Sequence, residues 1–230
     1  MESDIFKPVK NKSLSKMVME RIKEALIQKS LKPGDRLPTE TELCESLGVG
    51  KSSVREAVKM LEVLGVVEAR QGEGTFVARR VSETSVNPLV YQLLIDDGGV
   101  SDILELRRMF EPSYTLLAME KATQEDVARL REVHGAFAAA VERGTQTAED
   151  DMAFHYAVLE ATHNPFIIRI GRTIMQLFQV SIGESMKEIP QRAVADHEKI
   201  LQAFLARDPR ALRQAVLESF DGWASMLNKD

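Results

Sequence analysis

The stretch LGVGKSSVREAVKMLEVLGVVEARQGEGTFV, residues 47–77, decides the fold of the first part of this chain. Apolar side chains recur at helical spacing from Val54 to Leu61, which predicts a helix with one buried face. The opposite face carries cations and hydroxyls, on Lys51, Ser52, Arg55 and Lys59. A helix that points such groups outward from its first turns fits the major groove of DNA, and its N-terminal dipole favours contact with phosphate.

A short hairpin is predicted directly after this helix. Gly65 ends the helix, and the runs Val66–Arg70 and Thr75–Ala78 have the character of two short strands. Residues 71–74 between them, QGEG, supply glycines that can adopt positive φ in a tight turn. A helix followed by such a hairpin predicts a winged helix-turn-helix.

Two further helices are predicted upstream. Apolar residues every four positions from Leu14 to Leu26 indicate a first helix over about residues 13–29. Thr39 and Glu42 have the spacing of a capping box, which predicts a short second helix over residues 40–46. Gly50 is a weaker N-cap for the third helix than Ser or Thr. The alternative to DNA binding is a charged helix that packs on a hairpin for structural reasons only.

The net charge of −5 is divided unevenly along the 230 residues. Residues 1–80 hold 15 Lys and Arg against 12 Asp and Glu, a balance of +3, whereas residues 81–230 hold 15 against 23, a balance of −8. A nucleic-acid-binding surface needs only a local positive potential. The charge pattern therefore places DNA binding in the first 80 residues.

The cysteine content and hydropathy indicate a cytoplasmic protein. The single cysteine, Cys44, allows no internal disulfide, which is typical of a reducing compartment. The N-terminus has no apolar secretion signal, and no run of about 18 apolar residues occurs. We expect no membrane partner.

The second part of the chain is predicted to be entirely helical. The polar run Arg79–Asn87 lacks periodicity, so we divide the chain into domains over residues 1–80 and 88–230 with a linker at 81–87. Breaks at glycine, proline and capping residues delimit seven helices, at about 88–95, 101–121, 124–143, 148–162, 165–186, 194–206 and 209–228. The fold class is therefore mainly α, with a winged helix-turn-helix followed by an antiparallel bundle of seven helices.

Polar residues interrupt the apolar faces of this bundle. Asp151 and His155 lie four residues apart on the apolar face of one helix, and His197 lies in the apolar stripe of another. Burial of such groups without partners is costly, so they should meet one another, a metal ion or water. Three such ligands suit a divalent ion such as Zn²⁺, Ni²⁺ or Mn²⁺. The alternative is a hydrogen-bonded Asp151–His155 pair, with His197 satisfied separately.

Arg107 raises a similar question, because it lies in the inward stripe of its helix. A buried guanidinium is well suited to a carboxylate ligand, which it can hold with two parallel hydrogen bonds. The alternative is an ion pair with Glu111, four residues further along the same helix.

Together these residues resemble a known family over nearly the whole chain. The run LKPGDRLPTETELCESLGVGKSSVREAVKMLEVLGVVEARQGEGTFV resembles the DNA-binding domain of the GntR family of bacterial transcription factors. The segments LELRRMFEP, DMAFHYAVLEATHNP and DHEKIL resemble the FCD effector domain of its FadR subfamily. The resemblance implies a homodimer that binds a palindromic DNA operator, and a small organic acid in the FCD domain that changes operator affinity.

The resemblance also implies which residues contact DNA. The positions that match are Ser52, Ser53 and Arg55 on the third helix and Gly72 in the wing, and we add the cations Arg36, Lys51 and Lys59 as candidates. Three positions depart from the usual family pattern, at Thr41, Gly50 and Lys51. Because Lys51 stands where an arginine is common, it lacks the bidentate fork and should select bases less strictly.

In the second domain, the resemblance implies a metal ion held by an aspartate and three histidines. Asp151, His155 and His197 match three of these ligands, while Ser219 occupies the fourth position and is a poor ligand. Arg107 matches an arginine directed at the effector. Asn164 matches an Asn-Pro corner, a place that favours a role in the turn over a role in ligand binding, and it is kept as a candidate effector contact.

We therefore expect a ligand-responsive transcriptional regulator, a repressor rather than an enzyme, with a small carboxylate as its effector. The first alternative is a metal-dependent hydrolase built on the helical bundle and fused to a nucleic-acid-targeting domain. In that case a glutamate near Asp151, His155 and His197 would have to act as a base. A second alternative is a purely structural dimerisation module, whose bundle interior would contain no cavity.

Overall fold

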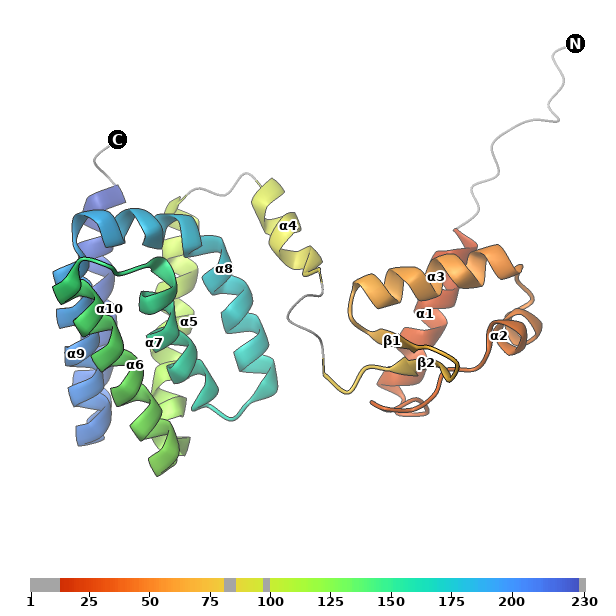
Figure 1. Ribbon diagram of the computed structural model, residues 1–230, viewed down its shortest axis with the longest axis horizontal. Coiled ribbons are helices and arrows are strands. Elements are labelled where there is room, and N and C mark those ends of the chain that lie inside the picture. Colours follow the sequence, from red (N-terminus) through yellow and green to blue (C-terminus); the bar gives the residue numbers. More distant parts are fainter. Residues whose placement is uncertain (1–12, 81–85, 97–99, 228–230) are drawn as a thin grey trace, which may run out of the picture. The chain divides into compact units, whose positions relative to one another are not determined.

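The computed structural model describes residues 13–80, 86–96 and 100–227 of the chain (Figure 1). It divides into two compact units, Met1–Pro88 and Leu89–Asp230. Residues 81–85 of the predicted linker lie outside the described residues, as does Asn228, the predicted end of the last helix. Among the described residues, no helix combines the length and the apolar character needed to cross a membrane.

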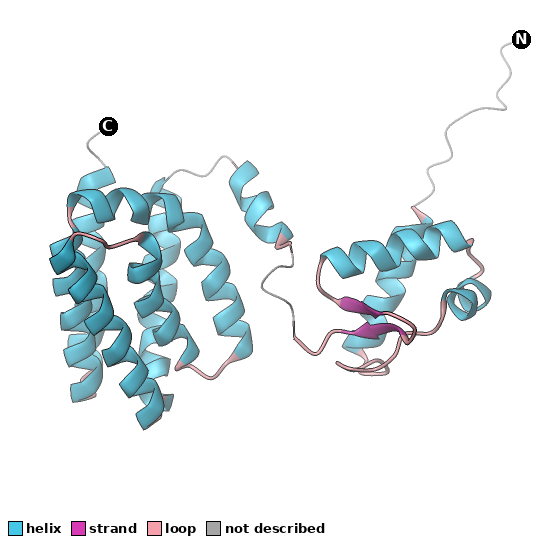
Figure 2. Cartoon of the chain, viewed as in Figure 1, coloured by secondary structure: helices cyan, strands magenta, loops and turns pink. Residues whose placement is uncertain are grey.

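The N-terminal unit contains three helices and a two-stranded sheet (Figure 2). Its elements are α1 (Leu14–Ile27), α2 (Glu40–Leu47), α3 (Lys51–Val63), β1 (Val67–Arg70) and β2 (Gly74–Val77). α1 packs on α3, and the fully buried side chains of Val18 and Val54 belong to their shared core. The predicted arrangement of three helices and a wing is confirmed.

Capping residues explain where α2 begins and ends. The Thr39 hydroxyl accepts a hydrogen bond from the Glu42 N–H, and the Glu42 carboxylate accepts one from the Thr39 N–H at 2.7 Å. The predicted capping box is therefore confirmed. Gly48 ends α2 in the left-handed region, at φ 65°. As expected, Gly50 provides no side-chain cap for α3.

The wing is an antiparallel pair that is held by the segment before α2. β1 and β2 pair from Val67 opposite Val77 to Arg70 opposite Gly74. Gly72 and Gly74 have φ of 77° and 113°, so the turn between the strands uses backbone conformations that favour glycine. The N–H of Leu37 donates to the carbonyl of Thr75 at 2.8 Å, which fixes the wing to the body of the unit.

The C-terminal unit is helical throughout its described residues. Its helices are α4 (Pro88–Ile95), α5 (Val100–Lys121), α6 (Gln124–Arg143), α7 (Ala148–Glu160), α8 (Pro165–Glu188), α9 (Pro190–Ala206) and α10 (Pro209–Leu227). α10 packs on α5 and α9, while α6 packs on α7 and α9, and α7 on α5 and α8. The seven predicted helices are present, but α4 has no buried residue, so the core is formed by α5–α10.

One helix boundary differs from the prediction in a way that matters for the site. α9 begins at Pro190, four residues before the predicted start at Val194. Pro190 lies in the predicted break between residues 186 and 194, because proline ends a helix when it falls in the interior. In the structure it is the first helical residue, a position where no backbone N–H is required and where the fixed φ of proline suits a helix. α9 therefore has an additional first turn.

The helices α7 and α8 approach each other closely at Gly171. A Cβ added there would overlap both methyl groups of Leu159 on α7 and would lie 3.1 Å from its Cγ. Leu159 is fully buried and cannot move aside freely. Glycine at this position therefore permits α8 to pack against the helix that carries Asp151 and His155.

We predict that Gly171→Ala lowers the free energy of unfolding by about 1–3 kcal/mol, because the added methyl group overpacks this contact. Gly135→Ala on the exposed face of α6 is a matched control, since nothing lies within 4 Å of its added Cβ. That control should raise stability by about 0.5–1 kcal/mol, as alanine does in place of glycine in a helix. Urea unfolding curves measure both changes. Equal effects of the two substitutions would contradict the packing argument.

Candidate functional site

The outer face of α3 presents the cations that the sequence assigns to DNA. Lys51, Ser52, Arg55 and Lys59 are exposed, and Ser53 is half-buried. The Nε of Arg55 donates to Oε2 of Glu40 at 2.8 Å, and the two side chains are 62% and 43% exposed. The helix thus keeps its cationic face in solvent while Val54 and Leu61 are buried beneath it.

The other two candidate DNA contacts lie at the wing. Gly72 is exposed at the tip of the hairpin, and Arg36 is exposed beside it. An added Cβ at Gly74 would lie 3.0 Å from the Arg36 Nε, so this arginine runs along the wing backbone. The structure therefore places all the candidate DNA contacts on exposed or half-buried positions of α3, the wing and the segment next to the wing.

The C-terminal unit contains a small cavity among its helices. The cavity measures about 60 Å³, which is enough for a few water molecules or a small ligand group. Its lining combines charged and imidazole groups with apolar side chains, and consists of Arg107, Asp151, His155, Ile182, Met186, Ile189, Arg192, Ala193, Asp196, His197, Ser219 and Phe220.

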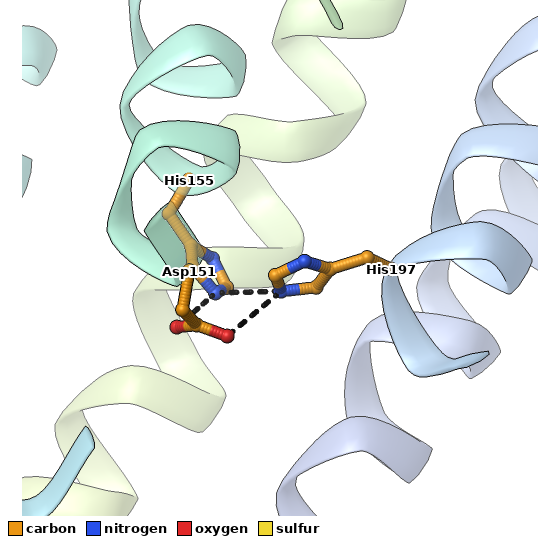
Figure 3. Close-up of side chains that lie close together, drawn as sticks. All are labelled: Asp151, His155 and His197. Atoms are coloured by element: carbon orange, nitrogen blue, oxygen red, sulfur yellow. Dashed lines mark hydrogen bonds and ion pairs between the residues drawn. The ribbon is translucent and has the colours of Figure 1, made fainter. Parts of the chain in front are cut away.

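Three potential metal ligands converge at this cavity (Figure 3). Asp151 and His155 project from α7, and His197 projects toward them from α9. The two Nε2 atoms are 3.2 Å apart, and the Asp151 carboxylate oxygens lie 3.8 Å from Nε2 of His155 and 3.5 Å from Nε2 of His197. These distances exclude the alternative in which Asp151 and His155 form a hydrogen bond and His197 is satisfied elsewhere.

The Glu111 carboxylate connects Arg107 with this cluster. Its Oε2 accepts from Nε and Nη2 of Arg107, at 3.1 and 2.9 Å, and its Oε1 lies 2.9 Å from Nδ1 of His155. The predicted burial of Arg107 is confirmed, since only 6% of the residue is exposed. The alternative that we considered for Arg107, an ion pair with Glu111, is also present.

Burial and neighbouring charges shift the pKa values of four ionisable side chains at the cluster, Glu111, Asp151, His155 and His197. Burial by itself raises the pKa of Glu111, but Arg107 and His155 outweigh it and lower the pKa to about 2. Burial lowers the pKa of His155, but Glu111 outweighs that effect and the pKa is raised. Burial and the neighbouring His155 hold the pKa of His197 well below its usual value. Burial raises the pKa of Asp151.

Ser219 and Asn164, which the resemblance connects with the metal ion and the effector, occupy different places in the structure. Ser219 lines the cavity, and its hydroxyl donates to the Val216 carbonyl at 2.8 Å. Asn164 is not part of the cavity lining, and its Oδ1 accepts from the N–H groups of Phe166 and Ile167 at the start of α8. The oxygen of Asn164 therefore serves a helix terminus, which agrees with the expected role in the turn and not with the candidate effector contact.

Two charged residues of the lining were missed by the sequence analysis. Arg192 lies in the additional first turn of α9, which the prediction had placed in a loop. Asp196 is on the same helix, with its Oδ2 3.6 Å from the Arg192 Nε. A helix predicted to start at the proline itself would have placed Arg192 and Asp196 on the same helix as His197, within about one and a half turns of it.

Comparison with known proteins assigns both halves of the chain. Residues 14–77 match the family described as "Bacterial regulatory proteins, gntR family", and residues 102–222 match the FCD domain. The HTH-type transcriptional regulator LutR of Bacillus subtilis is 31% identical, with 81% of this chain and 89% of that protein covered. The Glc operon transcriptional activator of Escherichia coli is 30% identical, with 88% and 84% covered.

A solved structure supports the same assignment. The structure titled "Streptococcus agalactiae GntR" superposes with a TM-score of 0.66 at 26% identity, with 92% of this chain and 99% of that one covered. The chain belongs to the gntR family of bacterial regulatory proteins and is a ligand-responsive, DNA-binding transcriptional regulator with a C-terminal FCD domain.

Proposed function

We propose that the protein acts as a homodimer that binds a palindromic operator, and that a small carboxylic acid bound with a divalent ion in the FCD cavity changes operator affinity. The observation that carries the proposal is the convergence of Asp151, His155 and His197 on a cavity that Arg107 also lines. By linkage, DNA must then change the affinity for the acid by the same factor.

In the N-terminal domain, Arg55 and Lys51 are the principal candidates for base contact. Both are exposed in the first turns of α3, where a recognition helix meets base edges. The ion pair of Arg55 with Glu40 is exposed, and such pairs contribute about 0–1 kcal/mol to stability. Arg55 can therefore leave Glu40 and bind a guanine at little cost in free energy. Arg36, Lys59 and the wing backbone at Gly72 would contact phosphates.

The three ligands at the cavity fit a first-row divalent ion. Ligand atoms bound about 2.0–2.2 Å from a tetrahedral Zn²⁺ are roughly 3.3–3.6 Å from one another. The observed separations of 3.2, 3.5 and 3.8 Å are close to that requirement. With Ser219 in place of a fourth imidazole, the ion would retain a position for water or for a carboxylate of the effector.

The effector would be a small acid. The cavity of about 60 Å³ limits its size, and the guanidinium groups of Arg107 and Arg192 in the lining favour an anion. We propose hydroxy, keto and sugar acids as the first classes to examine. Because one relative is named an activator, similarity does not favour our expectation of repression, which stays a prediction.

The hydrolase alternative requires a carboxylate that can accept a proton next to the cluster. Glu111 is the glutamate in contact with His155, but its carboxylate is committed to Arg107 and its pKa is about 2. A general base works best with a pKa near the working pH. The state of Glu111 therefore favours the regulator over the hydrolase.

We predict that Arg55→Ala weakens binding to the preferred duplex by about 5- to 150-fold, because a bidentate arginine contact with guanine is worth about 1–3 kcal/mol. Fluorescence anisotropy with a duplex selected from a random pool measures the change. Arg129→Ala, which removes an exposed cation from α6, is the matched control and should bind as the wild type does. Unchanged binding by Arg55→Ala would contradict the assignment of α3.

We predict that adding Zn²⁺ to chelator-treated protein raises the melting temperature, because a ligand that binds only the folded state stabilises it by about 2.7 kcal/mol at 100 times its Kd. Suitable acids should raise it further. His197→Ala should abolish both effects. His163→Ala, at an exposed histidine that pairs with Asp126, should keep them. An equal response of the two variants would exclude the proposed site.

We predict that Phe166→Asp shifts the protein from dimer to monomer in sedimentation velocity. Phe166 and Ile170 lie one turn apart on α8 and are 78% and 49% exposed, which is the character of a surface covered by a second copy. Ile27→Asp, at an α1 side chain that is 70% exposed, is the control and should leave the sedimentation coefficient unchanged. Dimers of unchanged stability in the Phe166 variant would exclude this face.

A further inference from the structure

We infer that Glu111 fixes the tautomer of His155, so that the Nε2 lone pair of this imidazole faces Asp151 and His197. Glu111 is then a positioning residue for the metal site rather than one of its ligands. This inference rests on the proposed function where it concerns the ion, but the tautomer itself is a property of the protein alone.

The two carboxylate oxygens of Glu111 contact different residues, one Arg107 and the other His155. Oε2 accepts both hydrogen bonds from Arg107, and Oε1 faces Nδ1 of His155 at 2.9 Å. Glu111, Arg107 and His155 are only 3%, 6% and 7% exposed, so solvent has little access to these bonds. An ionised carboxylate can only accept hydrogen bonds, and Nδ1 of His155 must therefore carry the proton.

The consequence appears on the other side of the same ring. A neutral imidazole with its proton on Nδ1 has its lone pair on Nε2. That atom lies 3.2 Å from Nε2 of His197 and 3.8 Å from Oδ2 of Asp151, at the point where the three ligand atoms converge (Figure 3). A hydrogen bond of this kind fixes the ring orientation and raises the basicity of the ligating nitrogen.

His197 provides a contrast within the same cluster. Its Nδ1 is buried and has no hydrogen-bond partner among the residues that the structure describes. With the lone pair of His155 on Nε2, the 3.2 Å contact requires the Nε2 of His197 to donate in the metal-free protein. The tautomer of His197 therefore follows from that of His155, and a reversed His155 ring should shift the His197 proton to Nδ1 as well.

Glu111→Gln tests the inference because Arg107 limits how the amide can orient. The guanidinium presents only donors, so the glutamine oxygen must face Arg107 and the NH₂ group must face Nδ1 of His155. Nδ1 then becomes the acceptor, and the proton moves to Nε2. The substitution should thus reverse the tautomer while it keeps the shape of the side chain.

The experiment is ¹⁵N NMR of the full chain with labelled histidine, without metal, at a pH high enough that the ring shifts no longer change. The chain has four histidines, so single substitutions assign the signals. We expect wild-type His155 to be protonated on Nδ1 and the Glu111→Gln variant on Nε2. Titration with Zn²⁺ should then show an affinity about 10–100-fold lower for the variant.

Glu198→Gln is the matched control. Glu198 is 46% exposed, and its Oε2 lies 2.7 Å from Nε2 of His134, so this variant changes a second histidine–glutamate pair outside the cluster. It should leave both the His155 signal and the Zn²⁺ affinity unchanged. A Zn²⁺ affinity that falls equally in the two variants would overturn the inference.

The outcomes separate this inference from the proposed function. A wild-type His155 protonated on Nε2, or a Glu111→Gln variant with an unchanged tautomer, would overturn the inference. Protonation on Nδ1 in a wild-type protein that binds no Zn²⁺ would support the inference on the tautomer and reject the metal proposal. If Glu111→Gln fails to fold, the wild-type spectrum alone still decides the tautomer.

Discussion

Burial of the Arg107 guanidinium inside a helical bundle would cost several kcal/mol without a partner, and Glu111, one turn further along α5, supplies that partner. The pair in turn allows His155 to be buried beside it, because Oε1 of Glu111 accepts the second hydrogen bond. The polar cavity of the FCD domain therefore depends on one carboxylate in α5. The side chains of Asp151 and His155 on α7 and of His197 on α9 lie beside the ion pair that Arg107 and Glu111 form on α5.

Much of this arrangement follows from local sequence. The Thr39–Glu42 capping box and the wing glycines are local signals, and the structure shows both where they were predicted. Asp151, His155 and His197 could be selected because polar residues on apolar helix faces need partners. That argument uses only the periodicity of single helices, and it predicts that the three side chains meet, as they do in the structure.

Other features could not be predicted because they depend on contacts between distant segments. Glu111 was considered only as a partner of Arg107 on the same helix, since nothing in the sequence shows that α5 and α7 pack together at His155. Apolar α4 was expected in the bundle, yet it has no buried residue in this chain. Pro190 was treated as a helix breaker, and the lining residue Arg192 was missed as a result.

The spacing of the cluster along the chain has a mechanical consequence. His155 and His197 are 42 positions apart in sequence and project from different helices, yet their rings meet. With Cys44 as its single cysteine, the chain has no disulfide to tie these helices together. An ion shared by the two rings would act as a reversible staple: it would close a long loop and restrict the unfolded chain, as a covalent cross-link does. Removing it would loosen α9 from α7 without breaking a covalent bond.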